Sequence, residues 1–169
     1  HPGAREALEG LISSEALFEE VSELLEQVYR ALGDNERLVG LLEKRVQFTQ
    51  GAADRVRLRL DLARVIEDKL GDAKRAQATL EAALQDDPSD LDVLVELERL
   101  MPVTSGWASG AEAFNKAIAA ASLSPDTARD LYVRLAGWHR DRLADKQAAE
   151  AAFEQALAKD PESLDILKA

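Results

Sequence analysis

Apolar residues recur along most of the chain at the three- and four-residue spacing of an amphipathic helix. One such face carries Leu58, Leu62, Val65, Ile66 and Leu70. No segment alternates between apolar and polar residues with the period of two that marks a strand, so we expect no β-sheet. The pattern predicts helices over residues 3–12, 16–32, 34–49, 54–70, 72–86, 88–101, 107–122, 125–143, 145–159 and 161–169.

Turn residues separate these helices. Gly71 followed by Asp72 predicts a helix that ends in a left-handed residue and a next helix that is capped by a carboxylate. Proline at the first position of a helix loses no hydrogen bond, because that N–H has no partner within the helix. We therefore expect helices to start after the capping residue in three pairs: Asp87-Pro88, Ser124-Pro125 and Asp160-Pro161.

The chain repeats itself. Residues 58–96 and residues 131–169, which are related by a shift of 73 without a gap, share 16 identities over 39 positions. Pro88 aligns with Pro161, and several alanines align with alanines. Shared composition alone would not keep these residues in register, so the chain contains at least two copies of one helical unit.

The two copies place large and small residues at set positions, and these positions resemble those of tetratricopeptide repeats. Both copies also carry one extra residue before the turn between the two helices, Leu70 and Leu143. The matching residues are Leu62, Ala63, Ile66, Ala76, Leu80, Ala83 and Pro88 in one copy, and Tyr132, Leu135, Ala136, Ala149, Phe153, Ala156 and Pro161 in the other. A third unit between them fits except at Glu98, where a small residue is expected.

The resemblance implies an all-α fold, a right-handed α-solenoid of about nine or ten antiparallel helices. A unit at the N-terminal side is degenerate, because Leu25, Leu38 and Arg45 stand where small residues are expected. We expect one solenoid segment of a longer array, over residues 1–169. Its parts are the end of a preceding unit (1–16), the degenerate repeat (17–52), three repeats (53–90, 91–124 and 125–163) and the start of a next unit (164–169).

Composition and charge narrow the possible partners. Hydrophobic residues make up 46% and charged residues 31%, as in folded soluble proteins. The formal net charge of −11 argues against nucleic-acid binding, including the reading of single-stranded RNA by a helical repeat. No apolar run is long enough to cross a bilayer, so we expect no membrane insertion and a cytoplasmic location.

Two short motifs resemble catalytic signatures but lack essential parts. His139-Arg140-Asp141 resembles the start of a kinase catalytic loop, yet the required Asn and the Asp-Phe-Gly motif are missing. We expect His139 to occupy a packing position within a helix. In the segment Gly106–Gly110 the serine is not midway between the glycines, as a nucleophile elbow requires. We expect a turn there, with Trp107 packed between helices.

The acidic segment 86–92 is the one stretch that invites a calcium site. Pro88 and Leu91 interrupt the ligand order of an EF-hand loop, and capping of a helix N-terminus explains the carboxylates. The sequence contains no cysteine and no glycine-rich phosphate loop. We therefore expect no catalytic residue, no metal and no cofactor, and a protein that is not an enzyme.

The resemblance also implies a concave groove lined by the first helix of each pair. Four arginines among the groove positions would form a broken basic stripe suited to the carboxylates of a peptide. Alternatively, these arginines pair with neighbouring acids such as Asp61 and Glu67. The implied groove residues are Arg57, Leu60, Arg64 and Glu67, then Asp92, Val95 and Arg99, then Asp130, Val133, Gly137 and Arg140.

The expected function is that of a non-catalytic scaffold, which holds a protein or peptide partner in this groove. The alternative is a spacer or assembly segment of a larger multidomain protein. A further expectation concerns the C-terminal helix, residues 161–169, where Leu164 and Leu167 have no following helix to cover them. We expect weak self-association through that end or fraying of it.

Overall fold

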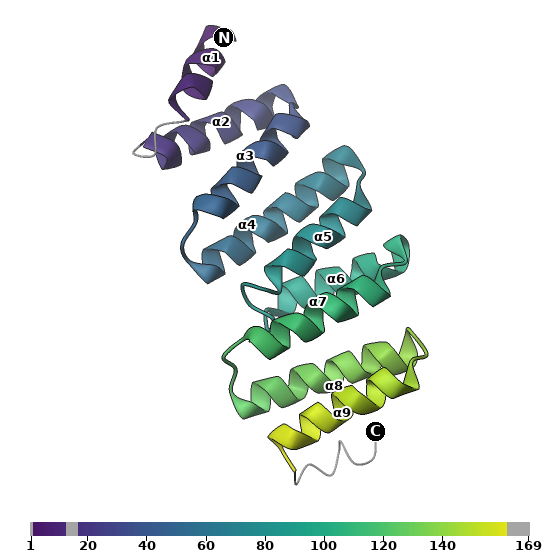
Figure 1. The fold of residues 1–169 in the computed structure, drawn as a ribbon. Helices are drawn as coiled ribbons and strands as arrows, with labels where there is room; N and C mark the ends of the chain where they lie inside the picture. The colour runs from purple at the N-terminus through teal and green to yellow at the C-terminus, as the bar shows by residue number, and fades with distance from the viewer. Residues whose placement is uncertain (1, 13–16, 162–169) are drawn as a thin grey trace. The chain divides into compact units, whose positions relative to one another are not determined.

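A computed structural model describes residues 2–12 and 17–161, and within them it forms nine α-helices, one π-helical segment and no strand. The expectation of an all-α protein is confirmed. The helices are α1 (Pro2–Leu11), α2 (Phe18–Leu32), α3 (Asn35–Phe48), α4 (Ala52–Val65) with the π segment η2 (Ile66–Leu70), α5 (Ala73–Ala83), α6 (Leu91–Thr104), α7 (Trp107–Ala120), α8 (Pro125–Asp141) and α9 (Lys146–Lys159), as Figure 1 shows. The predicted helix 161–169, and with it the expected self-association, falls on residues 162–169, outside those that the structure describes.

The helices belong to two compact units, His1–Ala76 and Gln77–Ala169, and the boundary lies within α5. In the first unit, α2 and α3 pack against each other, and Leu25 of α2 and Leu38 of α3 are both buried. Ion pairs join neighbouring helices at the surface of this unit. Arg30 of α2 lies 2.7 Å from Asp61 of α4, and Arg75 of α5 lies 2.8 Å from Glu43 of α3.

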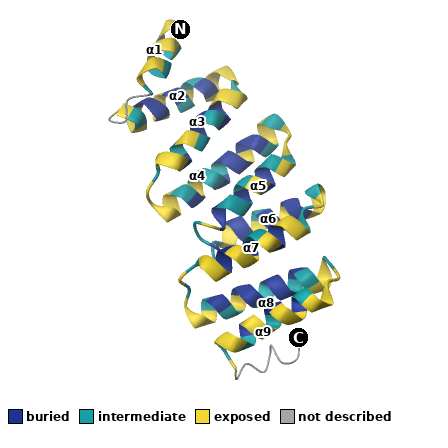
Figure 2. Ribbon diagram, viewed as in Figure 1, coloured by how far each residue is buried: buried dark blue, intermediate teal, exposed yellow. Residues whose placement is uncertain are grey.

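The second unit is built around aromatic and aliphatic side chains of α6, α7 and α8. The ring of Phe114 lies 4.8 Å from that of Trp138, and both residues are buried. Figure 1 shows α8 and α9 side by side and antiparallel, and Figure 2 shows the buried stripe along α8. The small residues Ala136, Ala149 and Ala156, at positions that the repeat reserves for small residues, are all buried.

Two of the predicted caps, Gly71-Asp72 and Ser124, are present. Gly33 and Gly71 adopt left-handed conformations with φ of 66° and 68°. The Asp72 carboxylate accepts a hydrogen bond from the backbone N–H of Arg75 at 2.9 Å, and Ser124 accepts one from Thr127 at 3.2 Å. These local signals position the helix ends because each satisfies a backbone group that the helix itself leaves unpaired.

The predicted start of a helix at Pro88 is wrong. Helix α6 begins at Leu91, and its N-cap is Asp90, whose side chain accepts from the N–H of Val93 at 3.0 Å. Asp87 instead accepts from the N–H and hydroxyl of Ser89, at 2.8 Å and 2.7 Å. Two carboxylates compete to cap this region, and the later one forms the helix while the earlier one closes a tight turn.

The extra residue before the turn in each repeat copy has a structural counterpart. In the first copy the chain winds as a π-helix over Ile66–Leu70. In the second copy the N–H of Leu143 donates to the carbonyl of Trp138, five residues earlier, at 3.2 Å. A π-type turn accommodates one inserted residue without changing the helix on either side. The repeat pattern therefore continues past the insertion.

Candidate binding surfaces on the second unit

Three of the four arginines of the predicted groove lie close to acids in their own helices. Arg57 is 3.6 Å from Asp54, and Arg99 is 2.9 Å from Glu96. Arg140 is 2.8 Å from Asp141, and the pKa of Arg140 is raised by this hydrogen bond and charge. These pairs favour the alternative in which the arginines are neutralised along the helix. One acid named in that alternative, Asp61, pairs with Arg30 of α2.

The remaining predicted groove positions divide between core and surface. Leu60 is 8% exposed and belongs to the core of the first unit, whereas Arg64 is exposed and Glu67 is half-buried. In the second unit, Asp92, Val95 and Asp130 are exposed, and Val133 and Gly137 are half-buried. Val95 is therefore the apolar side chain that projects furthest from the predicted surface.

A largely apolar stripe, interrupted by Glu98, follows one face of α6. Leu91, Val95, Glu98 and Pro102 recur at intervals of three and four residues, and we call them the α6 stripe. Leu91 and Val95 keep 67% and 56% of their surface exposed. Adjacent exposed aliphatic residues on a helix indicate a contact surface more strongly than isolated ones do.

The α6 stripe leads into a hollow of about 400 Å³, which we call the tryptophan hollow. Trp107 and Trp138 lie edge to face, with their rings 5.8 Å apart, and the Arg142 guanidinium lies 5.3 Å from the centre of the Trp107 ring. The prediction that Trp107 packs between helices is confirmed. The lining residues are Glu98, Pro102, Trp107, Arg134, Gly137, Trp138, Asp141 and Arg142.

Glu98, which departs from the repeat pattern, joins α6 to α8. Its carboxylate oxygen accepts from Nε of Arg134 and from the indole N–H of Trp138, both at 2.8 Å. Burial raises the pKa of the Glu98 carboxyl, but these two hydrogen bonds, together with the positive charges of Arg134 and Arg142, hold the pKa below its ordinary value. The sequence shows that Glu98 departs from the repeat pattern but does not reveal its role, because its partners Arg134 and Trp138 lie far along the chain.

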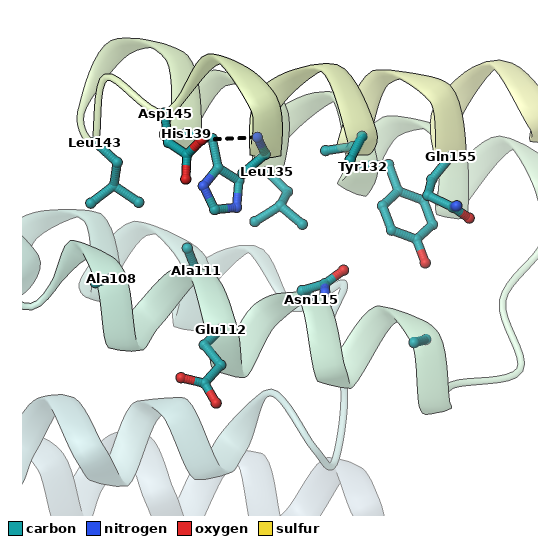
Figure 3. A pocket seen from close by; sticks show the side chains of 14 residues that line it. Ala108, Ala111, Glu112, Asn115, Tyr132, Leu135, His139, Leu143, Asp145 and Gln155 are labelled. Carbon is teal, nitrogen blue, oxygen red and sulfur yellow. Dashed lines mark hydrogen bonds between the residues drawn. The ribbon is translucent and has the colours of Figure 1, made fainter.

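A second concavity, of about 740 Å³, opens between α7, α8 and α9. Its floor is formed by Tyr132, Leu135 and His139 of α8, which Figure 3 shows in the space between α7 and α9. Its walls consist largely of alanines, so we call it the alanine groove. The wall and end residues are Ala108, Ala111, Glu112, Asn115 and Ala119 of α7, Leu143 and Asp145 of the turn, and Ala148, Ala151, Ala152 and Gln155 of α9.

The turn between α8 and α9 forms one end of the alanine groove. The N–H of Asp145 donates to the carbonyl of His139 at 2.9 Å, and the Asp145 carboxylate accepts from the N–H of Ala148 at 3.0 Å. His139 is half-buried, and within the described part of the chain its Nδ1 atom has no hydrogen-bond partner. His139 thus lies in the last turn of α8, within a helix as expected.

The two concavities lie on nearly opposite faces of α8. Groove residues Tyr132, Leu135 and His139 differ from hollow residues Arg134, Gly137 and Trp138 by about half a helical turn. Gly137 is the one predicted groove position that lines either of them. The alanine groove cannot be recognised from the sequence, because alanines that line a groove look the same there as alanines that pack between the helices of a repeat.

The remaining sequence candidates have structural roles. Ser109 donates to the Glu81 carboxylate at 2.8 Å from within α7. Among the described residues, no group of three or more His, Asp or Glu side chains is placed to hold a metal ion. Of the helices that the structure describes, none has the length and apolar character needed to cross a bilayer.

Comparison with known proteins finds no matching protein-family model and no matching curated protein.

Proposed function

We propose that this chain is a segment of a tetratricopeptide-like right-handed solenoid that binds an extended peptide of a partner protein. The peptide would lie on the α6 stripe and place a side chain in the tryptophan hollow. The scaffold carries no reaction of its own in this proposal. The sequence repeat, the buried alanines at its small positions and the capped helix hairpins support the solenoid.

The observation that carries the binding proposal is the continuity of the stripe with the hollow. Exposed Leu91 and Val95 lie on the same face of α6 as Glu98 and Pro102, which line the hollow. Aromatic residues and arginine are enriched in the centres of protein interfaces, where they contribute most of the binding energy. Trp107, Arg134 and Arg142 supply these groups here.

The hollow suits an apolar or aromatic peptide side chain. The indole rings offer apolar surface, and the guanidinium groups at its edge are donors for peptide carbonyls. Gly137 lacks a side chain, and an added Cβ there would meet no atom within 4 Å. A larger side chain at this position would therefore occupy the hollow without a clash at its first carbon.

A selection with displayed peptides tests the proposal. Peptides selected on the wild-type chain are measured against Gly137→Leu, which fills the hollow, and Val95→Asp, which charges the stripe. Gly40→Leu is the matched control, because Gly40 also lies inside a helix with no atom within 4 Å of an added Cβ.

We expect the selected peptides to lose at least about tenfold in affinity on the two surface variants and to keep their affinity for the control. The indole N–H signals of Trp107 and Trp138 should shift on binding in NMR spectra. Failure to select any peptide, or equal binding to Gly137→Leu and wild type, would favour a spacer or assembly role.

A further inference from the structure

The alanine groove is independent of the surface proposed above, because it uses the other face of α8. It follows α7 from Ala108 to Ala119, which corresponds to about 16 Å, or three helical turns. Alanine walls let the backbone of an incoming segment approach closely, since they hold no long side chain. The exposed apolar surface of the groove comes from wall alanines such as Ala108, Ala119 and Ala151, whereas Tyr132 and Leu135 beneath them are already buried.

The chemistry of the walls favours a helix over an extended strand. An extended segment needs a hydrogen-bond partner for each backbone N–H and carbonyl that it buries. Besides the charged Glu112 and Asp145, the polar side chains of the groove are Asn115, Tyr132, His139 and Gln155, and its walls are helices whose backbone groups already pair internally. A helix satisfies its own backbone and presents apolar side chains at intervals of three and four residues.

The charge of the groove favours a basic helix. Glu112 and Asp145 both line it, and neither lysine nor arginine does. The whole chain carries a net charge of −11, so a second copy of this chain would bring further negative charge to the site. A partner helix with lysine or arginine beside its apolar face complements both features.

We propose that the alanine groove is a docking site for a basic amphipathic helix of a partner protein. The apolar face of that helix packs between α7 and α9 over Tyr132 and Leu135. Its cationic side chains lie near Glu112 and Asp145.

Two pairs of matched variants separate groove binding from general attraction to an acidic protein. Glu112→Lys reverses a groove charge, and Glu154→Lys makes the same change at an exposed residue of α9 that does not line the groove. Ala151→Trp fills the groove, and Ala158→Trp adds the same bulk at an exposed alanine outside it. All four sites are exposed, so circular dichroism and thermal melting should show folded proteins.

The probes are a displayed library of helical peptides and two synthetic reference helices, one amphipathic with lysines and its counterpart with glutamates. We expect selection of lysine- or arginine-bearing helices, and an affinity at least about tenfold lower on Glu112→Lys and Ala151→Trp than on their controls. Binding should weaken with added salt, and NMR shifts should map to Ala111, Tyr132, Leu135 and Ala151.

Several outcomes would overturn the proposal. They are equal binding of the glutamate helix, equal loss on Glu112→Lys and Glu154→Lys, and NMR shifts confined to the tryptophan hollow. Groove signals that move with protein concentration in the absence of peptide would show that a second copy fills the groove instead. If peptides bind the wild type but fail to bind only the Gly137→Leu variant, that result concerns the tryptophan hollow of the proposed function and not the alanine groove.

Discussion

Gly40, Gly110 and Gly137 lie inside helices α3, α7 and α8, and the structure predicts that of these three only Gly110 resists replacement by alanine. An added Cβ at Gly110 of α7 would lie 2.3 Å from the sulfur of Met101, which is fully buried. An added Cβ at Gly40 of α3 or Gly137 of α8 meets no atom within 4 Å. Gly110 thus allows α6 and α7 to approach closely, at a position that the repeat pattern reserves for a small residue.

The expected free energies follow from two opposing terms. Replacing glycine by alanine inside a helix stabilises it by about 0.8–1 kcal/mol. Overpacking a buried contact costs about 1–3 kcal/mol. Gly40→Ala should therefore stabilise the first unit by about 1 kcal/mol. Gly110→Ala should be about 1–3 kcal/mol less favourable than this control.

Urea unfolding followed by circular dichroism measures both variants, and a double-mutant cycle with Met101→Ala identifies the clash. Met101→Ala alone should cost about 2–5 kcal/mol through the cavity it leaves. In that background Gly110→Ala should become stabilising, because the sulfur is gone. The reasoning is refuted if Gly110→Ala stabilises the wild type as much as Gly40→Ala does, or if its cost is unchanged when Met101 is absent.

Four further outcomes are expected in unfolding experiments. Ala144, which has φ of 53° where the other repeat copy has Gly71, should gain about 1 kcal/mol on replacement by glycine, whereas Gly71→Ala should lose a similar amount. Gln77→Leu should cost about 1–3 kcal/mol, because Gln77 is 3% exposed and donates to the Gly106 carbonyl at 2.9 Å. Leu80→Ala should cost about 2–5 kcal/mol, and an unchanged thermal midpoint would contradict its burial. Because the pKa of Glu98 is lower in the folded state, its ionised carboxylate stabilises the fold above the unfolded-state pKa of about 4.3. The stability advantage of wild type over Glu98→Gln should therefore shrink as pH falls through the folded-state pKa. An advantage that does not depend on pH would contradict this role of Glu98.

Much of the fold is predictable from local features of the sequence. Helix boundaries at Gly33, Gly71 and Ser124 depend on the conformation of one residue and on hydrogen bonds to neighbours within a few positions. These boundaries can therefore be predicted without the tertiary structure. The repeat of small residues likewise predicted burial at Ala136 and Ala156, because close approach of helices requires small side chains.

The proposed binding surfaces could be recognised only from the tertiary structure. Glu98 meets Arg134 and Trp138 across 36 and 40 residues of sequence, and no local pattern specifies which side chain fills such a contact. The ion pairs show the same limit, since Asp61 pairs with Arg30, which lies 31 residues away in the sequence.

The sequence by itself determined most of the helices, the caps at Gly71-Asp72 and Ser124, and the spacing of the repeat, because these depend on neighbouring residues. Only the tertiary structure decided that Asp90 and not Asp87 starts α6, and that α8 presents a tryptophan hollow on one face and an alanine groove on the other. The physical reason is that alanine and tryptophan both pack well inside a helical repeat. Whether such a residue closes a contact or lines a concavity depends on the distance to the next helix, which no single segment encodes.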